Sequence, residues 1–363
     1  MKIFTVFSTG TERCSILSNI KMETTTRRDY RSLVLMIVLA VAFVLSFAIC
    51  VSFGSIKIGF GDLFKIVFGL GDVDPVLHDI VWDIRFPRTL GAWLGGSALA
   101  VSGILLQVFF KNPIVEPYIL GISSGATLCV ALVVLGGLTF GMGAAASLVV
   151  FFAALIGSSI VMVVVLIFAT RVKDVVTLLI IGLMVGYLCS AVTMILQSFA
   201  TAEELQGFTM WTMGSFSGFT WAGIKILFAL SIPIFASLIF LVKPLNAFLM
   251  GEEYAISMGV NIKGFRIALV AITSVLTSVV TAFAGPVSFI GLSVPHLTRL
   301  IFKSSDNRLL VPGSIMMGGI VTAFCDLISR TIVSPVELPI SAVTAFIGAP
   351  IVIFLIMKRR TSL

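Results

Sequence analysis

Long runs of apolar residues alternate with short polar segments along most of this 363-residue chain. A run of about 20 apolar residues is long enough to cross a bilayer as a helix. The predicted spans are 32–54, 89–110, 117–137, 144–170, 175–199, 221–242, 264–284, 287–302, 309–328 and 338–357. The third and eighth are rich in Gly, Ser and Pro. The pattern predicts an all-α polytopic membrane protein with about ten transmembrane helices.

The basic residues are concentrated in alternate polar segments. With the N-terminus inside, 18 of the 24 Lys and Arg residues fall in or beside segments assigned to the cytoplasm: 1–31, 111–116, 170–174, 243–266, 299–308 and 358–363. The acidic residues show no such bias. Because basic loops favour the cytoplasmic side, we expect a multi-pass protein of the cell (inner) membrane with both termini in the cytoplasm.

The same alternation predicts the domain organisation. Spans two to five and seven to ten would cross the membrane in opposite senses, as in the inverted repeats of transporters. We expect a cytoplasmic tail over 1–31 and one transmembrane domain over 32–358, with a cytoplasmic segment at about 246–263. Arg27, Arg28 and Arg31 precede an apolar run that is too long for a signal peptide. Residues 1–21 have no evident role, and Met22 is an alternative start.

Composition excludes several other classes of protein. The chain is 58% hydrophobic and 11% charged, which no soluble domain of this size requires. Its formal charge of +7 lies at span ends rather than in one patch, so nucleic acid is not an expected partner. The cysteines are dispersed and odd in number, which fits neither a disulfide framework nor a metal site: Cys14, Cys50, Cys129, Cys189 and Cys325.

No metalloprotease or nucleotide-binding motif is present. HExxH and the phosphate-binding GxxxxGK[ST] are absent, and His78 and His296 fall on opposite sides of the predicted membrane. We therefore expect no cofactor and no metal, and any nucleotide energy must come from another chain. A secondary carrier or channel working without ATP is the alternative. It would require ion-binding groups within the spans, whereas four acidic residues lie near span ends: Glu116, Asp174, Asp326 and Glu337.

Two long segments resemble a known family of transporters. "IRFPRTLGAWLGGSALAVSGILLQVFFKNPIVEPYILGISSGA" (84–126) and "GPVSFIGLSVPHLTRLIFKSSDNRLLVPGSIMMGGIVTAFCDLISRTIVSPVELPISAVTAFIGAP" (285–350) are similar to the permeases of binding-protein-dependent ABC importers for iron-siderophores, haem and cobalamin. "GEEYAISMGV" matches a third block of that family. The resemblance covers nearly all of 80–358 in collinear order.

The resemblance implies a transporter subunit rather than an enzyme. It implies two permease copies, as a homodimer or close heterodimer, with two copies of an ATP-binding subunit and an extracytoplasmic solute-binding protein. The expected cargo is a metal chelate, iron(III)-siderophore first and haem or cobalamin next. The expected partners also include membrane lipid.

The resemblance also assigns a coupling element. The family's short cytoplasmic helices between spans six and seven fit a cleft of the ATPase subunit. The matching residues here are Gly251, Glu252, Glu253, Ala255, Gly259 and Val260. A short rigid helix ended by Gly259 would transmit ATPase closure to the spans. The alternative is an ordinary helix in an interfacial loop.

On the outer side, the resemblance implies docking of the binding protein at Arg85, Arg88 and Arg330. Arginine suits this role because its planar guanidinium binds carboxylates in a bidentate manner. Local ion pairs are the alternative, since Asp83 precedes Arg85 by two residues and Asp326 precedes Arg330 by four.

The translocation pathway is assigned from fewer residues. Matching the loop between spans four and five places Val175 and Val176 where the cobalamin permease has small hydroxyl residues at its inner gate. A hydrophobic constriction can close a pathway by dewetting. Asn112, Ser123 and Ser124 are further candidates for the pathway wall, with close helix packing as the alternative. Packing also explains the glycine stripe of span two: Gly91, Gly95, Gly96 and Gly103.

Overall fold

The computed structural model describes residues 10–54, 58–70, 74–138, 145–172 and 174–360, and all regular structure in these residues is helical. The first half of the chain forms α1 (Gly10–Ser52), α2 (Phe60–Phe68), α3 (Pro75–Asp79), the π-helix η1 (Ile80–Arg85), α4 (Phe86–Phe109), the 3₁₀-helix η2 (Pro117–Leu120), α5 (Ile122–Val134), α6 (Ala145–Arg171) and α7 (Val175–Phe199). The second half forms α8 (Ala202–Thr212), α9 (Trp221–Met250), α10 (Glu252–Ser257), α11 (Ile262–Ala284), α12 (Ile290–Phe302), α13 (Asn307–Thr331) and α14 (Ile340–Arg360). The predicted all-α fold is confirmed.

The ten predicted spans correspond to ten apolar helices. Within the described residues, seven helices are long and apolar enough to cross a membrane by themselves, and three are shorter, at Ile122–Val134, Ile290–Phe302 and Ile340–Phe354. Two of the short helices follow a residue of positive φ, Gly121 (φ 77°) before α5 and Phe289 (φ 66°) before α12. The chain therefore turns sharply into these two helices, which is why the Gly- and Pro-rich spans are short.

Helix α4 lies within the bundle because its small residues allow neighbouring backbones to approach closely. A Cβ atom at Gly103 would meet the backbone of Gly291 in α12, and one at Gly96 would meet Gly318 and Thr322 in α13. These two glycines therefore serve helix packing.

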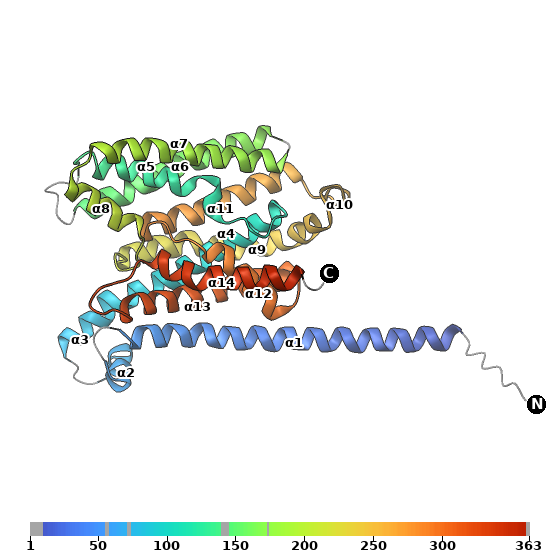
Figure 1. The fold of residues 1–363 in the computed structure, drawn as a ribbon. Coiled ribbons are helices and arrows are strands. Elements are labelled where there is room, and N and C mark those ends of the chain that lie inside the picture. The colour runs from blue at the N-terminus through green and yellow to red at the C-terminus, as the bar shows by residue number, and fades with distance from the viewer. Residues whose placement is uncertain (1–9, 55–57, 71–73, 139–144, 173, 361–363) are drawn as a thin grey trace, which may run out of the picture.

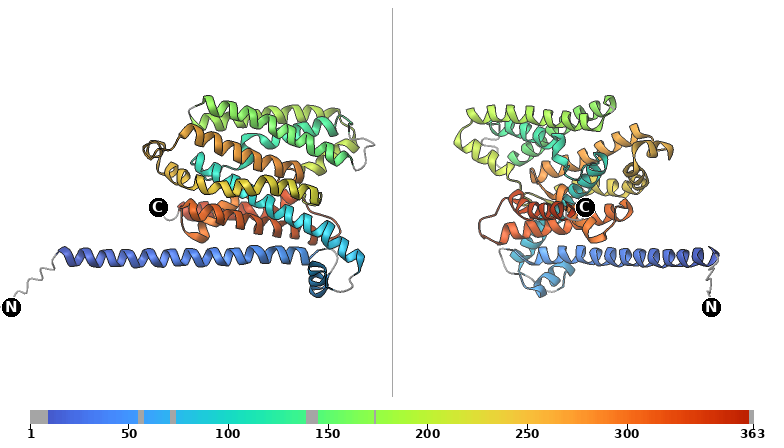
Figure 2. Two further views of the ribbon diagram at one scale, coloured as in Figure 1. Left: turned by 180° about the vertical axis from the view of Figure 1, so that it is seen from behind. Right: turned by 45° about the vertical axis from the view of Figure 1, so that its right-hand side comes forward.

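The two ends of the bundle carry different segments. Figure 1 shows the start of α7, α10 and the end of α14 at one end, and α2, α3 and α8 at the other. The views in Figure 2 keep this arrangement. We call these the α10 end and the α3 end. The described parts of the polar segments that the alternation assigns to the cytoplasm lie at the α10 end (Figure 1).

Helix lengths repeat between the two halves of the bundle. Helices α4 to α7 have 24, 13, 27 and 25 residues, and α11 to α14 have 23, 13, 25 and 21 residues. In both groups the second helix is the short one. This order is consistent with the inverted repeat predicted from the alternation.

Several helices differ from the sequence-based expectation. Helix α1 begins at Gly10, so it runs through most of the predicted tail, and residues 1–9 lie outside the described part of the chain. Helix α8 was not predicted, because it is too short to be a span. Its start is fixed by a capping box, in which Thr201 and Glu204 satisfy each other's backbone N–H groups.

Candidate coupling and docking sites

A six-residue helix, α10, separates α9 from α11. Gly251 precedes it with φ 131° and Gly259 follows it with φ 81°, values that favour glycine. Ala255, in its middle, is fully buried, and its carbonyl accepts a hydrogen bond of 3.0 Å from the N–H of Val260. The two glycines and this buried contact therefore fix the direction of α10.

The other face of α10 is exposed. Glu252 and Glu253 occupy its first turn, where a negative charge is favourable at a helix N-terminus. Tyr254, Ile256 and Met258 are also exposed. Exposed apolar residues with charged neighbours are typical of a surface that binds another protein.

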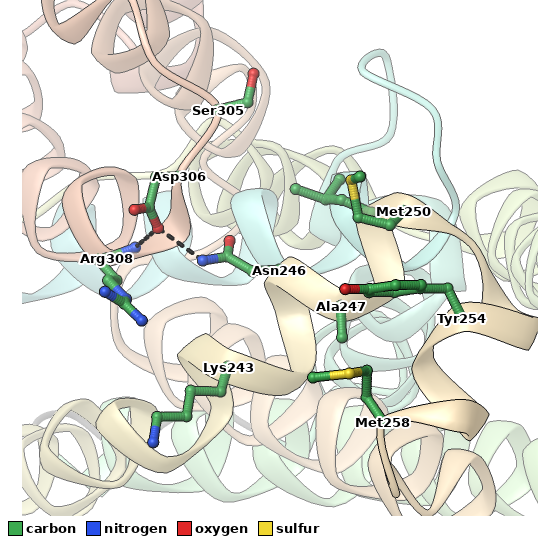
Figure 3. A pocket seen from close by; sticks show the side chains of 10 residues that line it. Lys243, Asn246, Ala247, Met250, Tyr254, Met258, Ser305, Asp306 and Arg308 are labelled. Atoms are coloured by element: carbon green, nitrogen blue, oxygen red, sulfur yellow. Dashed lines mark hydrogen bonds between the residues drawn. The ribbon is translucent and has the colours of Figure 1, made fainter. Parts of the chain in front are cut away.

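An open cleft of about 740 Å³ lies beside this exposed face. Figure 3 shows Tyr254 of α10 and Met258, which follows α10, on one side of it, with Lys243 and Asn246 of α9 and Arg308 of α13 among its other lining residues. A second cleft of about 580 Å³ is lined by α9, by Met258 and by the start of α11. Met258 therefore borders two depressions, and the surface around α10 is contoured rather than flat.

A cluster of amide and carboxyl groups joins α9 to the start of α13. The Asn246 side chain donates to Asp306 at 2.6 Å and accepts from the backbone and side-chain N–H groups of Asn307 at 2.9 and 2.8 Å. Asp306 also caps α13 by accepting from the backbone N–H of Arg308 at 2.9 Å (Figure 3). This cluster holds one wall of the larger cleft in place.

The predicted gate residues begin α7. Asp174 caps this helix by accepting from the N–H and the hydroxyl of Thr177, each at 2.8 Å. Both hydrogen bonds lower the pKa of Asp174, and the bond from the Thr177 hydroxyl has the larger effect. Val175 is half-buried, whereas Val176 is 59% exposed. The cap therefore sets where Val176 projects from the molecule.

The remaining pathway candidates lie in two other segments. The Asn112 side chain accepts from the N–H of Ile114 at 3.0 Å and so shapes the turn after α4. Ser123 and Ser124 are half-buried in the first turn of α5, and the Ser124 hydroxyl lies beside Gly186 of α7. Ser124 therefore lies at a contact between α5 and α7, while Asn112 belongs to a loop.

The predicted docking arginines are buried at the α3 end. Arg88 donates its Nε to both carboxylate oxygens of Asp326 at 3.0 and 3.1 Å. Its terminal nitrogens bind Glu337 at 2.5 and 3.1 Å. The Asp326 side chain is 3% exposed and that of Glu337 is 41% exposed. Glu337 therefore forms the solvent-facing part of this ion-pair network.

Arg330 and Arg85 connect the same region to the end of α1. Arg330 lies 3.6 Å from Asp326 and donates to the carbonyl of Cys50. Arg85 donates to the carbonyls of Val51 and Ser52 at 3.0 and 2.9 Å. Of the two local ion pairs suggested by the sequence, the pair of Asp326 with Arg330 is present. For the other, Asp83 is exposed, and Arg85 binds the end of α1.

Comparison with known proteins identifies the family. The sequence profile of the FecCD transport family matches residues 38–358. The chain belongs to the FecCD transport family. It is 31% identical over 326 residues to the hemin transport system permease protein HmuU of Yersinia pestis, covering 89% of this chain and 96% of that protein. It is 35% identical over 280 residues to the vitamin B12 import system permease protein BtuC of Escherichia coli O9:H4, covering 77% of this chain and 84% of that protein.

A solved structure has the same fold. An inward-facing transporter of the metal-chelate ABC type superposes with a TM-score of 0.78 at 27% identity, covering 89% of this chain and 98% of that one. This FecCD protein is therefore a multi-pass permease subunit of the ABC importer type. The family consists of transporter subunits, so the prediction of a transporter rather than an enzyme agrees with it.

The structure separates the candidate residues of this FecCD permease into two groups. The coupling residues and the gate valines lie at the α10 end, and the three arginines gather at the α3 end. Motif reading missed several residues of these two ends: Asn246, Asp306, Glu337 in its role beside Arg88, and the carbonyls that end α1. Their charge or amide character was visible in the sequence, but only the fold brings them together.

Proposed function

We propose that this chain is the membrane subunit of an ATP-driven importer of a metal chelate, iron(III)-siderophore first and haem or cobalamin next. The observation that carries the proposal is the α10 surface. A short rigid helix with an acidic first turn lies beside two clefts, in a chain that has no phosphate-binding loop of its own. Such a surface suits a partner that binds and hydrolyses ATP. The relatives named for hemin and vitamin B12 support a chelate as the cargo.

Two ATP-binding subunits would meet α10 from the cytoplasm. Glu252 and Glu253 would face basic groups of that partner, while Tyr254, Ile256 and Met258 would supply apolar contact. Gly251, Ala255, Gly259 and Val260 would keep α10 rigid, so that movement of the partner is transmitted to α9 and α11 rather than absorbed by the loop.

A solute-binding protein would dock at the α3 end. Arg85, Arg88 and Arg330 are buried, so an acidic partner would first meet Glu337 and would reach Arg88 by replacing that carboxylate. This exchange conserves the charge around Arg88 and removes the cost of leaving a buried guanidinium unpaired. Docking by the three arginines thus requires a movement of the loop between α13 and α14.

A second permease copy would complete the pathway. Helix α7 exposes large apolar residues along its length, including Ile180, Met184 and Leu188, and α14 exposes Phe346 and Phe354. These faces fit a second copy in a homodimer or close heterodimer, with lipid covering the rest. Val175 and Val176 would form the inner constriction, with Asn112, Ser123 and Ser124 near the pathway wall.

Transport in reconstituted liposomes tests the proposal. The chain is incorporated with an ATP-binding subunit and a solute-binding protein from the same organism, and an iron(III)-hydroxamate chelate, haemin and cyanocobalamin are offered separately. Uptake of one chelate that requires internal ATP and the binding protein is expected. Uptake that proceeds equally well without ATP would contradict the proposal and favour a secondary carrier.

A further inference from the structure

Arg266, in the first turns of α11, lies between two functional elements of the α10 end. Its side chain is only 7% exposed. Charged side chains are rarely so buried unless they are paired, so the partners of Arg266 are of interest. Arg266 was not singled out by any motif. Its surroundings belong to three different segments, namely α10, the end of α6 and the end of α4.

The guanidinium of Arg266 contacts all three segments. One terminal nitrogen donates to the carbonyl of Val172 at 2.6 Å, immediately after α6. The other lies 3.7 Å from a carboxylate oxygen of Glu252 in α10. The guanidinium carbon is 5.9 Å from the centre of the Phe109 ring, within the range of a cation–π contact. A single planar group therefore joins α10 to the connection between α6 and α7.

We propose that Arg266 is a positioning residue that transmits movement of α10 to the α6–α7 connection, which precedes Val175 and Val176. This inference rests on the proposed function, because it assigns α10 to the ATPase and the two valines to the inner gate. Arg266 touches neither ATP nor the cargo. It would act by setting the position of the backbone from which the gate residues project.

The contacts of Arg266 with Val172 and with Glu252 differ in length. The contact with Val172 has the length of a strong charge-assisted hydrogen bond, whereas the contact with Glu252 is longer than a direct hydrogen bond. Arg266 is thus held firmly to the loop and loosely to α10. Movement of α10 by about 1 Å toward Arg266 would close the longer contact into a hydrogen bond of ordinary length. Movement away would release it.

Aromatic rings and a second carboxylate, that of Asp174, also surround Arg266. Phe109, whose ring lies 5.9 Å from the guanidinium carbon, packs against Phe248, and Phe248 packs against Phe265, with ring centres 6.2 and 5.5 Å apart. Asp174, which caps α7, is also influenced by the charge of Arg266, although its hydrogen bonds with Thr177 dominate the lowering of its pKa. The charge of Arg266 therefore acts on both sides of the loop before the gate.

Three variants and one control separate positioning from folding. Arg266→Gln removes the charge, Arg266→Lys keeps the charge but loses the planar fork, and Glu252→Gln removes only the α10 partner. Lys263→Gln is the control, because Lys263 is an exposed basic residue in the first turn of the same helix. Each is assembled as the full complex in liposomes, and ATP hydrolysis is measured together with uptake of whichever of the three named chelates the wild type imports.

The ratio of chelate imported to ATP hydrolysed is the decisive quantity. We expect Arg266→Gln to lower it about tenfold, within the range of coupling between distant sites, while hydrolysis remains close to wild type. The ratio for Arg266→Lys and for Glu252→Gln should lie between those of Arg266→Gln and the wild type. The ratio for Lys263→Gln should match the wild type. An unchanged ratio for Arg266→Gln, or an equal loss of uptake, hydrolysis and assembled complex, would overturn the inference. Absence of ATP-dependent uptake by the wild type would instead refute the proposed function.

A second readout needs no cargo. Val176→Cys is introduced after the five native cysteines are replaced, and its rate of reaction with a maleimide is measured with and without ATP and vanadate. The wild-type background should show an ATP-dependent change in this rate, because Val176 lies in the first turn of α7, directly after the α6–α7 connection. Arg266→Gln should abolish the change while ATP still binds. A change of the same size in both backgrounds would show that Arg266 does not connect α10 to the loop.

Discussion

Replacing Asp326 with alanine removes the anion that two buried arginines share. The Asp326 side chain is 3% exposed and lies 3.0 Å from Arg88 and 3.6 Å from Arg330. Loss of one partner from a buried ion pair costs about 3–5 kcal/mol. Because Arg88 keeps Glu337 and Arg330 keeps the carbonyl of Cys50, we expect about 3 kcal/mol, the lower end of that range.

Thiol labelling measures this cost in the folded protein. Cys50 and Cys325 are both 1% exposed and lie on α1 and α13. Arg330, the neighbour of Asp326, joins these two helices by donating to the carbonyl of Cys50. Their reaction with a maleimide in detergent micelles requires local opening, whose rate follows the free energy of that opening. A loss of about 3 kcal/mol predicts labelling about 100-fold faster in Asp326→Ala.

Glu337→Gln is the matched comparison, since it removes a carboxylate from the same Arg88 at a side chain that is 41% exposed. Exposed ion pairs contribute about 1 kcal/mol or less, so labelling should rise no more than about fivefold. Asp326→Leu combined with Arg88→Met should recover part of the lost stability, because an apolar pair can replace the buried Arg88–Asp326 ion pair, while Arg330 still lacks its carboxylate partner. Equal effects of Asp326→Ala and Glu337→Gln would refute the reasoning.

Three further predictions concern packing, the cleft and acid stability. Gly103→Ala should lower the yield of folded protein, because its Cβ meets the Gly291 backbone and overpacking costs about 1–3 kcal/mol; Gly61→Ala, which meets nothing within 4 Å, is the control, and equal yields on size-exclusion chromatography would contradict this. Asn246→Ala removes three hydrogen bonds between α9 and α13 and should weaken co-purification with the ATPase severalfold. The lowered pKa of Asp174 stabilises the fold at neutral pH, and this contribution is lost as pH falls through that pKa, so thermal stability should fall more steeply with acid in the wild type than in Asp174→Asn.

Sequence patterning predicted the helices well because membrane spans are determined by composition over long windows. Apolar runs of about 20 residues leave a helix as the simplest way to satisfy the backbone in lipid. The basic residues in alternate polar segments also predicted which of these segments share one side of the membrane, and the described parts of those segments lie together at the α10 end. Short elements such as α2, α3 and α8 were missed because no long window contains them, although the capping box at Thr201 and Glu204 was a local signal for α8.

The candidate sites were predictable only in part. A motif could point to Glu252 and to Arg88, because each stands in a recognisable stretch of sequence. It could not show that Glu252 faces Arg266, or that Arg88 is enclosed by Asp326 and Glu337. Those contacts join residues that are far apart in the chain or on different helices, and burial determines their strength. The buried state of the arginines in particular depends on how the end of α1 packs against α4 and α13.

Binding and activity of the ATPase subunit with a charge-reversed α10 test the central claim most directly. Glu252→Lys/Glu253→Lys is compared with wild type and with Glu203→Lys, an exposed reversal on α8 at the opposite end. If α10 is the coupling surface, the double variant should lose ATP-driven chelate uptake, and its ATPase should either dissociate or hydrolyse without transport. Glu203→Lys should keep both ATPase binding and basal hydrolysis. Full ATP-driven uptake by the double variant would contradict the account.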